Sequence, residues 1–322
     1  MLRMHHSRAA GCQNDNEPRT DKRARHSAMP AHLRRANGRQ AKRGVSSGLA
    51  KIQQAMTFST ITSKFKLTDL IGKVSTLNYS IIIPTYNEEG PIRQCLESIR
   101  RQTYDRSQYE IIVSDASSTD QTLSIAKPLC DTIVSTEKRG IALGRNLGAA
   151  SSVGEYLVFV DADATLQSDF LSRCDESFRD RSVVAVTGIA RPADGTMFPR
   201  FVYTMTYLLV RFFNKFGLSL FPGVCVAYRA EAFRKLKGFR EDFGIVEDLD
   251  LSRRASKLGK CVVQKQAIAF VSTRRLEKHA LSTVLFHIYS DMKYLLTGKA
   301  ALRYPKREEI STWRDLWKSK EQ

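Results

Sequence analysis

The sequence of 322 residues has no long apolar run. Its most hydrophobic stretch, Phe201 to Phe221, is interrupted by Arg211, Asn214 and Lys215, whereas a membrane-spanning helix needs about 20 mostly apolar residues. The N-terminal residues also lack the apolar core of a secretory signal. We therefore expect neither a spanning helix nor export by that route, and we predict a cytoplasmic protein.

Cysteines are few and far apart. The chain has six, and no two are spaced as Cys-x-x-Cys. Disulfide frameworks, zinc ribbons and thiol redox sites depend on clustered cysteines, so the sequence argues against all three classes. Reduced thiols agree with a cytoplasmic location.

Acidic and aromatic residues are scarce at the N-terminus. Residues 1–50 hold eleven Lys and Arg against three Asp and Glu, with no Phe, Trp or Tyr. Because aromatic side chains stack the bases of single-stranded nucleic acid, we predict a basic, disordered tail rather than a nucleic-acid arm. Residues 51–78 carry scattered apolar positions and are expected to form a linker or a short helix.

From Tyr79 onward, short apolar runs alternate with amphipathic stretches. This pattern is typical of an α/β domain with a mainly parallel sheet flanked by helices, and we predict such a domain over residues 79–272. Strands are expected at 79–84, 109–114, 132–135, 156–160, 183–189 and 223–228, and near Val262 and Phe270. Helical spacing covers 90–101, 120–130, 141–151, 168–179, 230–236 and 247–258.

Polar residues follow the first two of these strands, where ligands of parallel sheets bind. Pro84 has no N–H for the sheet and ends the first strand, which leaves Thr85, Tyr86 and Glu88 available to a base or ribose. After the second strand, Asp115 can accept a hydrogen bond from a ring N–H. The two loops therefore predict a nucleoside site.

A basic segment precedes the helix expected at 141–151. It contains Gly140, and Arg145 and Asn146 follow within the helix. Guanidinium groups near a helix start can neutralise a diphosphate. A solvated basic face is the alternative interpretation.

The strongest local signal is the strand 156–160 running directly into Asp161-Ala162-Asp163. Residues two apart on an extended segment point the same way, so both carboxylates can act together. Oxygen ligands of this kind suit Mg or Mn bridging to a diphosphate. Dehalogenase-type phosphatases also use such a motif, but near the start of their domain, whereas several strands precede it here.

The last element is Glu247-Asp248, which opens the helix expected at 247–258. The dipole at a helix N-terminus favours carboxylates, so these acids are either helix caps or site residues.

In this order and spacing, the five elements resemble the family 2 glycosyltransferases with a GT-A fold, over roughly residues 79–270. The resemblance implies that Asp161 approaches ribose or metal and that Asp163 is the principal metal ligand, with Ala162 between them in the donor-binding motif. It also implies a nucleoside cradle and a nucleotide-side loop formed by Pro84, Thr85, Tyr86, Glu88, Asp115, Gly140, Arg145 and Asn146.

On the acceptor side, Asp248 matches the general base of that family, Glu247 would position sugar or acceptor, and Arg254 falls where the family has a helix arginine. The implied reaction is metal-dependent, inverting transfer of a sugar from a UDP- or GDP-linked donor to a glycan, glycolipid or polyprenyl phosphate. A phosphate acceptor is already ionised, so Asp248 would then orient rather than deprotonate it. The Gln-x-x-Arg-Trp sequence of processive members is absent.

Two other functions stay open at this point. A sugar-phosphate nucleotidyltransferase shares the topology but needs a Gly-rich loop after its first strand, which Pro84 to Asn87 do not provide. A non-catalytic adaptor at the membrane would use the basic ends of the chain. A nucleotide-sugar assay separates both from a glycosyltransferase.

Residues 273–322 form a basic, amphipathic C-terminal segment. A helix with this composition lies on a membrane surface or packs on its own domain. We predict peripheral contact with the inner face of the cell membrane. The apolar positions on one helical face are Leu281, Val284, Leu285, Ile288, Met292, Leu295 and Leu296.

Overall fold

The computed structural model describes residues 77–194 and 197–300, without the side chains of 274–283. The predicted tail (1–50) and nearly all of the linker (51–78) therefore lie outside the described residues, as do residues 301–322. The boundaries at 79–272 and 273–322 stay predictions.

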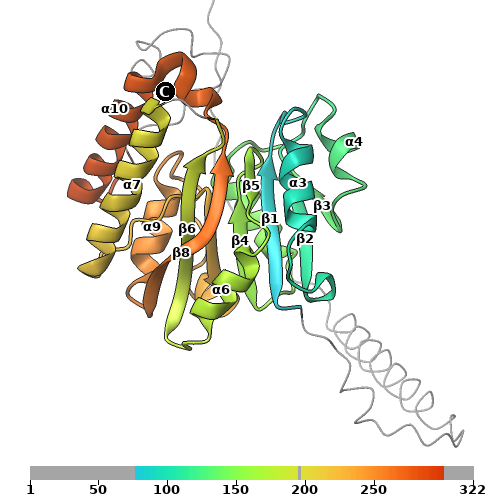
Figure 1. The fold of residues 1–322 in the computed structure, drawn as a ribbon, viewed down its shortest axis with the longest axis horizontal. Coiled ribbons are helices and arrows are strands. Elements are labelled where there is room, and N and C mark those ends of the chain that lie inside the picture. Colours follow the sequence, from blue (N-terminus) through green and yellow to red (C-terminus); the bar gives the residue numbers. More distant parts are fainter. Residues whose placement is uncertain (1–76, 195–196, 301–322) are drawn as a thin grey trace, which may run out of the picture. The chain divides into compact units, whose positions relative to one another are not determined.

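The first half of the sheet is parallel and follows the order β3-β2-β1-β4 (Figure 1). Its aliphatic runs are buried, as expected of parallel strands covered by helices on both faces. The elements are β1 (Tyr79–Thr85), α3 (Ile92–Arg100), η1 (Arg106–Gln108), β2 (Tyr109–Asp115), α4 (Thr122–Ala126), β3 (Thr132–Ser135), α5 (Ile141–Ala150) and β4 (Tyr156–Val160).

The second half is mixed and continues the order as β4-β7-β6-β8-β5. Strand β7 runs antiparallel to β4 and β6, and β8 is parallel to β6 but antiparallel to β5. Four of the seven pairings are thus parallel, and the predicted α/β class is confirmed. The elements are β5 (Ala164–Leu166), α6 (Phe170–Phe178), β6 (Val183–Pro192), α7 (Met197–Lys215), β7 (Cys225–Arg229), α8 (Ala230–Lys235), α9 (Glu247–Ala255), β8 (Lys260–Val271) and α10 (Arg274–Thr297).

The link between β4 and β5 curls the sheet. Only Asp161, Ala162 and Asp163 separate these two strands in sequence, yet β7, β6 and β8 lie between them in the sheet order. A flat sheet cannot satisfy both conditions, so the sheet curls and brings β5, the last strand in this order, back toward β4. The acidic turn therefore connects the middle of the sheet to its far edge.

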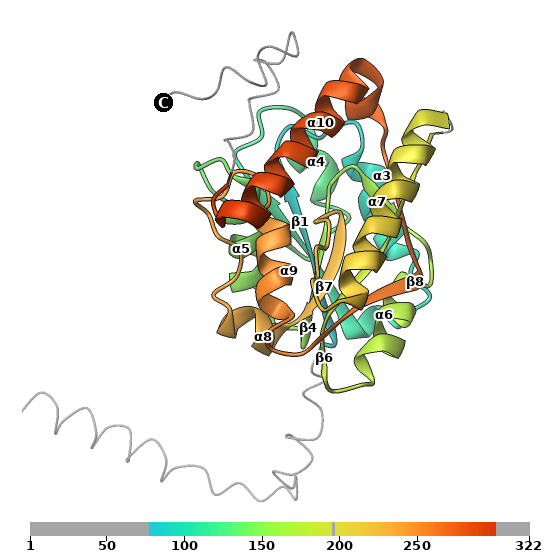
Figure 2. The ribbon, with the colours of Figure 1, turned by 90° about the vertical axis from the view of Figure 1, so that its left-hand side faces the viewer.

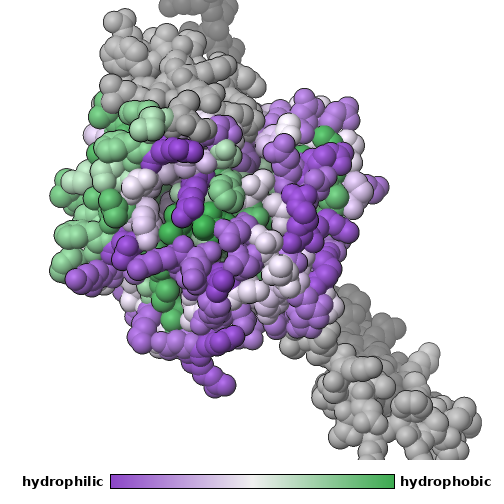
Figure 3. All heavy atoms as spheres, in the orientation of Figure 1, coloured by the Kyte–Doolittle hydropathy of each residue, from purple (hydrophilic) through white to green (hydrophobic). Residues whose placement is uncertain are grey.

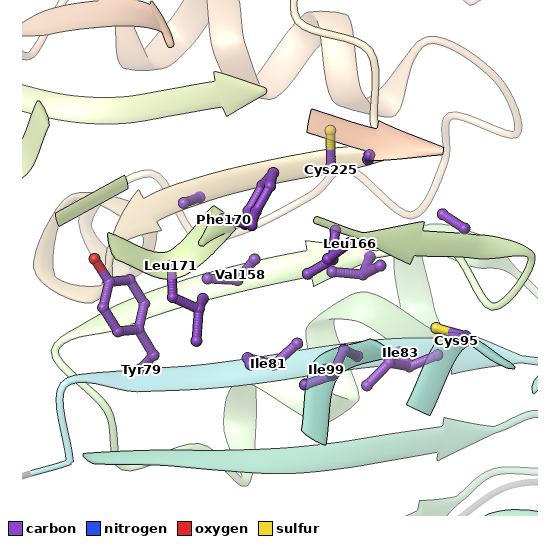
Figure 4. Packing of buried hydrophobic residues seen from close by; sticks show 14 of the residues in the cluster. Tyr79, Ile81, Ile83, Cys95, Ile99, Val158, Leu166, Phe170, Leu171 and Cys225 are labelled. Carbon is purple, nitrogen blue, oxygen red and sulfur yellow. The ribbon is translucent and has the colours of Figure 1, made fainter. Parts of the chain in front are cut away.

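Apolar side chains fill both sides of the sheet. Figure 4 shows one cluster, which includes Ile81 of β1, Ile99 of α3 and Phe170 of α6. On the opposite face α5 packs directly on β1, because a Cβ at Gly148 would lie only 2.4 Å from Ile82 Cγ2. This close packing fixes the helix that carries Arg145.

Three elements differ from the sequence expectations. The helix expected at 120–130 is only Thr122–Ala126. Lys127 still has helical dihedral angles, but Pro128 has no N–H with which to continue the helical hydrogen bonds. The two strands expected near Val262 and Phe270 are one strand, β8, whose register against β6 shifts between these positions. Strand β5 was missed because three residues carry too little pattern.

Helix α7 was also missed, since the sequence was interpreted there only as an apolar stretch and its helical period was not used. It contacts the sheet mainly through β6, with Pro199 and Val210 buried. The opposite side, called the α7 face below, carries the exposed side chains of Met197, Phe198, Phe201, Met205, Leu208, Leu209, Phe212 and Phe216.

The predicted C-terminal amphipathic helix is α10, but its described side chains pack through a different row from the one expected. Phe286, Ser290 and Tyr294 are buried. Much of the predicted apolar face points outward instead, and the α10 row consists of Leu285, Ile288, Met292 and Leu296, all exposed. Within the described part of the chain, none of the helices combines the length and apolar character that crossing a bilayer requires.

Candidate active site

The carboxyl ends of β1, β2 and β4 meet at one edge of the sheet and place Thr85, Asp115 and Asp161 there. The acidic turn after β4 is fastened on both sides. The N–H of Asp161 donates to the carbonyl of Val224 at 3.2 Å, and the carbonyl of Asp163 accepts from the N–H of Ser272 at 3.2 Å. Residues ahead of β7 and after β8 thus hold the turn in place.

Arg145 is the centre of the acidic cluster and is only 2% exposed. Its Nη1 donates to Glu247 Oε1 at 2.8 Å, and its Nη2 donates to Asp161 Oδ1 at 2.9 Å and to the carbonyl of Gly223 at 3.0 Å. A Cβ at Gly223 would lie 2.5 Å from Nη2, so glycine makes room for the guanidinium. Arg145 was expected to face a diphosphate; in the structure its charge is directed to carboxylates.

The electrostatics of this cluster follow from burial and from the carboxylates gathered around Arg145. Burial alone would lower the pKa of Arg145, but Asp161, Glu247 and Asp248 outweigh burial, and the pKa is raised. Burial raises the pKa of Glu247, with Asp248 adding to the effect and Arg145 opposing it. Three carboxylates therefore share one buried cation.

Asp248 lies half-buried in the first turn of α9. Its Oδ2 accepts from the N–H of Gly223 at 2.5 Å and its Oδ1 from the N–H of Leu249 at 2.8 Å. The side chain thus caps backbone donors and also lies at the acidic cluster, so the two sequence interpretations do not exclude each other. The predicted pair Glu247-Asp248 and the predicted Asp161 are brought together here.

The residue before this pair is strained. Val246 has φ +67° and ψ +14°, a left-handed conformation that is costly for a β-branched residue. Such outliers cost on the order of 1–3 kcal/mol and persist only where the surroundings impose them. Burial of Val246 beside Phe243 and Phe286 provides that constraint.

The predicted nucleoside side is built from two cross-linked loops. Asp115 is 1% exposed and accepts from the N–H of Ser118 at 2.9 Å. The N–H of Glu88 donates to Thr122 Oγ1 at 2.8 Å. Among the described residues, the buried Thr85 Oγ1 has no hydrogen-bond partner, so a polar group at the end of β1 is left to be satisfied.

The remaining residues of the predicted donor site lie around these loops and the acidic turn. Arg139 lies 4.2 Å above the ring of Tyr86. Pro84 packs below α5, since a Cβ at Gly144 would lie 3.3 Å from it. Gly140 precedes α5 with φ +156°, and Ala162 is buried within the acidic turn.

Asn146 and Arg254 make structural contacts instead of entering the cluster. Asn146 exchanges two hydrogen bonds of 2.9 Å with the backbone of Phe239. Arg254 donates to Asp250 Oδ2 and to the carbonyl of Leu236, both at 2.7 Å. Both side chains hold the loop that leads to Glu247.

Asp291 of α10 is a site residue that the sequence interpretation missed. It is half-buried, and burial together with the neighbouring Asp248 raises its pKa to about 7. The sequence feature that could have identified it is the scarcity of acidic residues in α10, which contains only Glu277 and Asp291. A lone acid between apolar residues is a candidate for a functional position.

The raised pKa of Asp291 predicts how stability depends on pH. The unfolded carboxyl, with an ordinary pKa of 3.8, loses its proton before the folded one does at about 7. Stability should therefore fall as pH rises between these values, by at most about 1.4 kcal/mol per pH unit. Urea unfolding of the metal-free protein across this window should show a weaker decline for Asp291→Asn. An unchanged pH dependence would contradict the assignment.

The donor set for a metal is limited. No group of three His, Cys, Asp or Glu side chains suited to a metal converges within residues 77–194 and 197–300, side chains of 274–283 aside. Asp161 and Asp163 supply two carboxylates on one turn, and Glu247, Asp248 and Asp291 add negative charge nearby. This chemistry suits a hard divalent cation that keeps ligands from substrate and water.

Comparison with known proteins identifies relatives. The family model described as Glycosyl transferase family 2 matches residues 80–237. Glycosyltransferase AglE from Haloferax volcanii is 34% identical over 137 residues, 39% of this chain and 45% of the relative. A second relative, from Methanococcus voltae, is 36% identical over 107 residues, 31% of this chain and 33% of the relative. Its name is dolichyl N-acetyl-alpha-D-glucosaminyl phosphate 3-beta-D-2,3-diacetamido-2,3-dideoxy-beta-D-glucuronosyltransferase.

A solved structure is similar over a larger part of the fold. The mannosyltransferase PcManGT from Pyrobaculum calidifontis, in complex with GDP-Man and Mn2+, matches with a TM-score of 0.58 and 27% identity. The match covers 70% of this chain and 66% of that one, whereas the chain spans less than half the length of the two curated relatives. Together with the order of the acidic and nucleoside-side elements, these similarities show that residues 80–237 form a domain of glycosyl transferase family 2 and that the fold is GT-A.

Proposed function

We propose that the chain transfers a sugar from a nucleoside-diphosphate sugar to an acceptor, with inversion at the anomeric carbon. The observation that carries the proposal is the acidic cluster, in which the buried Arg145 links Asp161 of the β4 turn to Glu247 of α9. One cation thereby sets the relative positions of the donor-side and acceptor-side carboxylates. A displacement reaction needs such fixed geometry between its two reactants.

Asp163 and Asp161 would hold a Mn or Mg ion. The fit rests on carboxylate oxygens carried by one short turn and on the further carboxylates of Glu247 and Asp248 around Arg145. When bound, the ion would stabilise negative charge on the departing nucleoside diphosphate. The relative solved with GDP-Man and Mn2+ supports this choice.

The donor nucleoside would lie across the ends of β1 and β2. The unpartnered Thr85 Oγ1 would hydrogen bond to the base or ribose, and Asp115 can accept from a ring N–H while it keeps its bonds to Ser118. The ring of Tyr86 can stack beside the base, because Arg139 already steadies its other side. The proposed donor is a UDP- or GDP-linked sugar.

Asp248 would take the proton of an acceptor hydroxyl as the oxygen attacks the anomeric carbon. The bond to the Gly223 N–H orients the carboxylate, and Glu247, held by Arg145, would position the sugar or acceptor. For a polyprenyl phosphate acceptor, Asp248 would orient the phosphate group instead. The acceptor class is thus a glycan, glycolipid or lipid phosphate, and the proposed location is the cytoplasm at the inner face of the cell membrane.

A donor screen tests this function. Purified full-length protein is incubated with Mn and individual UDP- and GDP-sugars, with and without acceptors, and nucleoside diphosphate release is measured. We expect release with one donor class. Asp248→Asn should keep donor binding and lower transfer to a hydroxyl acceptor by about 100-fold or more, the scale of lost acid–base catalysis.

The outcomes separate the alternatives. Pyrophosphate-dependent formation of a nucleotide sugar would identify a nucleotidyltransferase, and donor binding with no release under any condition would favour a non-catalytic adaptor. Full transfer to a hydroxyl acceptor by Asp248→Asn would exclude this carboxylate as the base. Thr85→Val retains the shape of the side chain and should weaken donor binding only.

A further inference from the structure

The α7 face has no partner in the described structure. Eight large apolar side chains lie exposed between Met197 and Phe216. Phe201, Phe212 and Phe216 are 63%, 57% and 70% exposed, far more than core side chains. Exposed apolar areas of this kind mark sites where a protein meets another protein or a membrane.

The exposed residues form one stripe rather than a scatter. Phe201, Met205, Leu208 and Phe212 follow one another at spacings of three and four residues, which places them on one side of the helix. Pro199 and Val210 face the opposite way, into the protein. At about 1.5 Å per residue, the 19 residues of α7 present a stripe of about 28 Å.

The polar residues of α7 indicate what covers this stripe. The helix has no Asp or Glu, and its charged residues are Arg200, Arg211 and Lys215. All three are exposed and, by helical periodicity, fall along one border of the stripe. An apolar stripe bordered by cations is the pattern of a helix that lies in the interface of an anionic membrane.

Helix α10 repeats this arrangement on the same side of the molecule. The α10 row is exposed, with Leu296 at 78%, and Lys293 lies nearby in the same helix. Figures 1 and 2 agree that α7 and α10 lie on one side of the sheet. Figure 3 shows a continuous apolar area over that side.

We propose that the α7 face and the α10 row dock the protein onto the surface of an anionic lipid bilayer without crossing it. A second copy of the chain is a poorer occupant, because pairing through the same face would bring two sets of cations together. The bilayer accepts the apolar stripe at the acyl boundary and the bordering cations at its phosphates. This surface extends the membrane contact expected of residues 273–322 to a helix within the central fold.

The docking surface lies close to the acidic turn between β4 and β5. A hollow of about 510 Å³ beside α7 is lined by Arg200, Tyr203 and Tyr207 of the helix, by Pro192 at the end of β6 and by Phe270 near the end of β8. The residue after β8, Ser272, bonds to the Asp163 carbonyl. A docked enzyme would therefore meet a lipid-linked acceptor at the membrane surface, a consequence that rests on the proposed function although the docking does not.

Vesicle flotation of the full chain tests the docking. Phosphatidylcholine vesicles are compared with vesicles that also contain phosphatidylglycerol. The test variant is Phe201→Ser with Phe212→Ser, which removes two exposed rings without changing the net charge or the basic N-terminal residues. The matched control is Val153→Ser with Leu258→Ser, at exposed apolar positions outside both helices.

We expect wild type and control to float with the anionic vesicles and the test variant to bind at least tenfold more weakly. Equal binding of test variant and wild type would overturn the proposal, since the basic tail alone would then explain it. It would also be overturned if wild type failed to bind vesicles and sedimented as a dimer that the test variant dissociates. Unchanged nucleotide release by the test variant in solution keeps this result separate from the catalytic proposal.

Discussion

Replacing Asp163 with asparagine is expected to lower sugar transfer by about 100-fold or more, because a metal contributes several kcal/mol and each 1.36 kcal/mol is tenfold in rate. An amide keeps the shape of the side chain but removes the negative charge that a divalent cation needs. Initial rates should be measured over a range of Mn concentrations. Since the loss arises from weaker metal binding, part of it should return at high Mn.

The matched control is Asp180→Asn. Asp180 precedes β6, at the end of the sheet opposite the acidic turn, and pairs with Lys260 at 3.0 Å. The control substitution therefore removes the same charge as Asp163→Asn, but far from the proposed site. Its transfer rate should stay within about twofold of wild type, as expected for a surface pair. Wild-type rates for Asp163→Asn at low Mn would contradict the metal assignment.

Replacing Arg145 with methionine is expected to have the largest effect on stability. Breaking a buried ion pair by removing one partner costs about 3–5 kcal/mol, because the other charge stays buried without compensation. Here both Asp161 and Glu247 lose their cation. Urea unfolding followed by circular dichroism should show a marked fall in the transition midpoint, and transfer should be lost even under conditions where the variant is folded.

Two further variants define the cause. Arg145→Lys keeps the charge but cannot reach two carboxylates and the Gly223 carbonyl together, so an intermediate loss is expected. Arg106→Met removes an exposed arginine that pairs with Asp131, and its cost should be about 1 kcal/mol or less. Equal losses in Arg145→Met and Arg106→Met would show that burial does not strengthen the cluster.

The parallel half of the fold was predictable because its signals are local. Apolar runs ended by Pro84, Asp115 and Asp161 mark both the strand and the edge at which it ends. The structure brings Asp161, Glu247 and Asp248 to one cluster, as the motif order indicated.

The rest depended on distant contacts. Nothing near Arg145 in sequence indicates that its guanidinium is buried by Glu247, more than 100 residues later. The influence of Asp248 on Asp291 requires the packing of α10. The outward direction of the α10 row likewise depends on which row of α10 packs against the α9 side of the fold. Periodicity identifies a helix, but it does not determine which of two apolar rows is covered.

The three-residue turn between β4 and β5 also sets the order in which the protein can be completed during synthesis. Its carboxylates leave the ribosome before β8, which begins at Lys260 and is the strand that β5 pairs with in the described sheet. Contacts between residues so distant in sequence form slowly. A nascent chain that ends before β8 therefore has the acidic turn without its final support, and we expect affinity for a divalent cation to appear only after the last strand has joined the sheet.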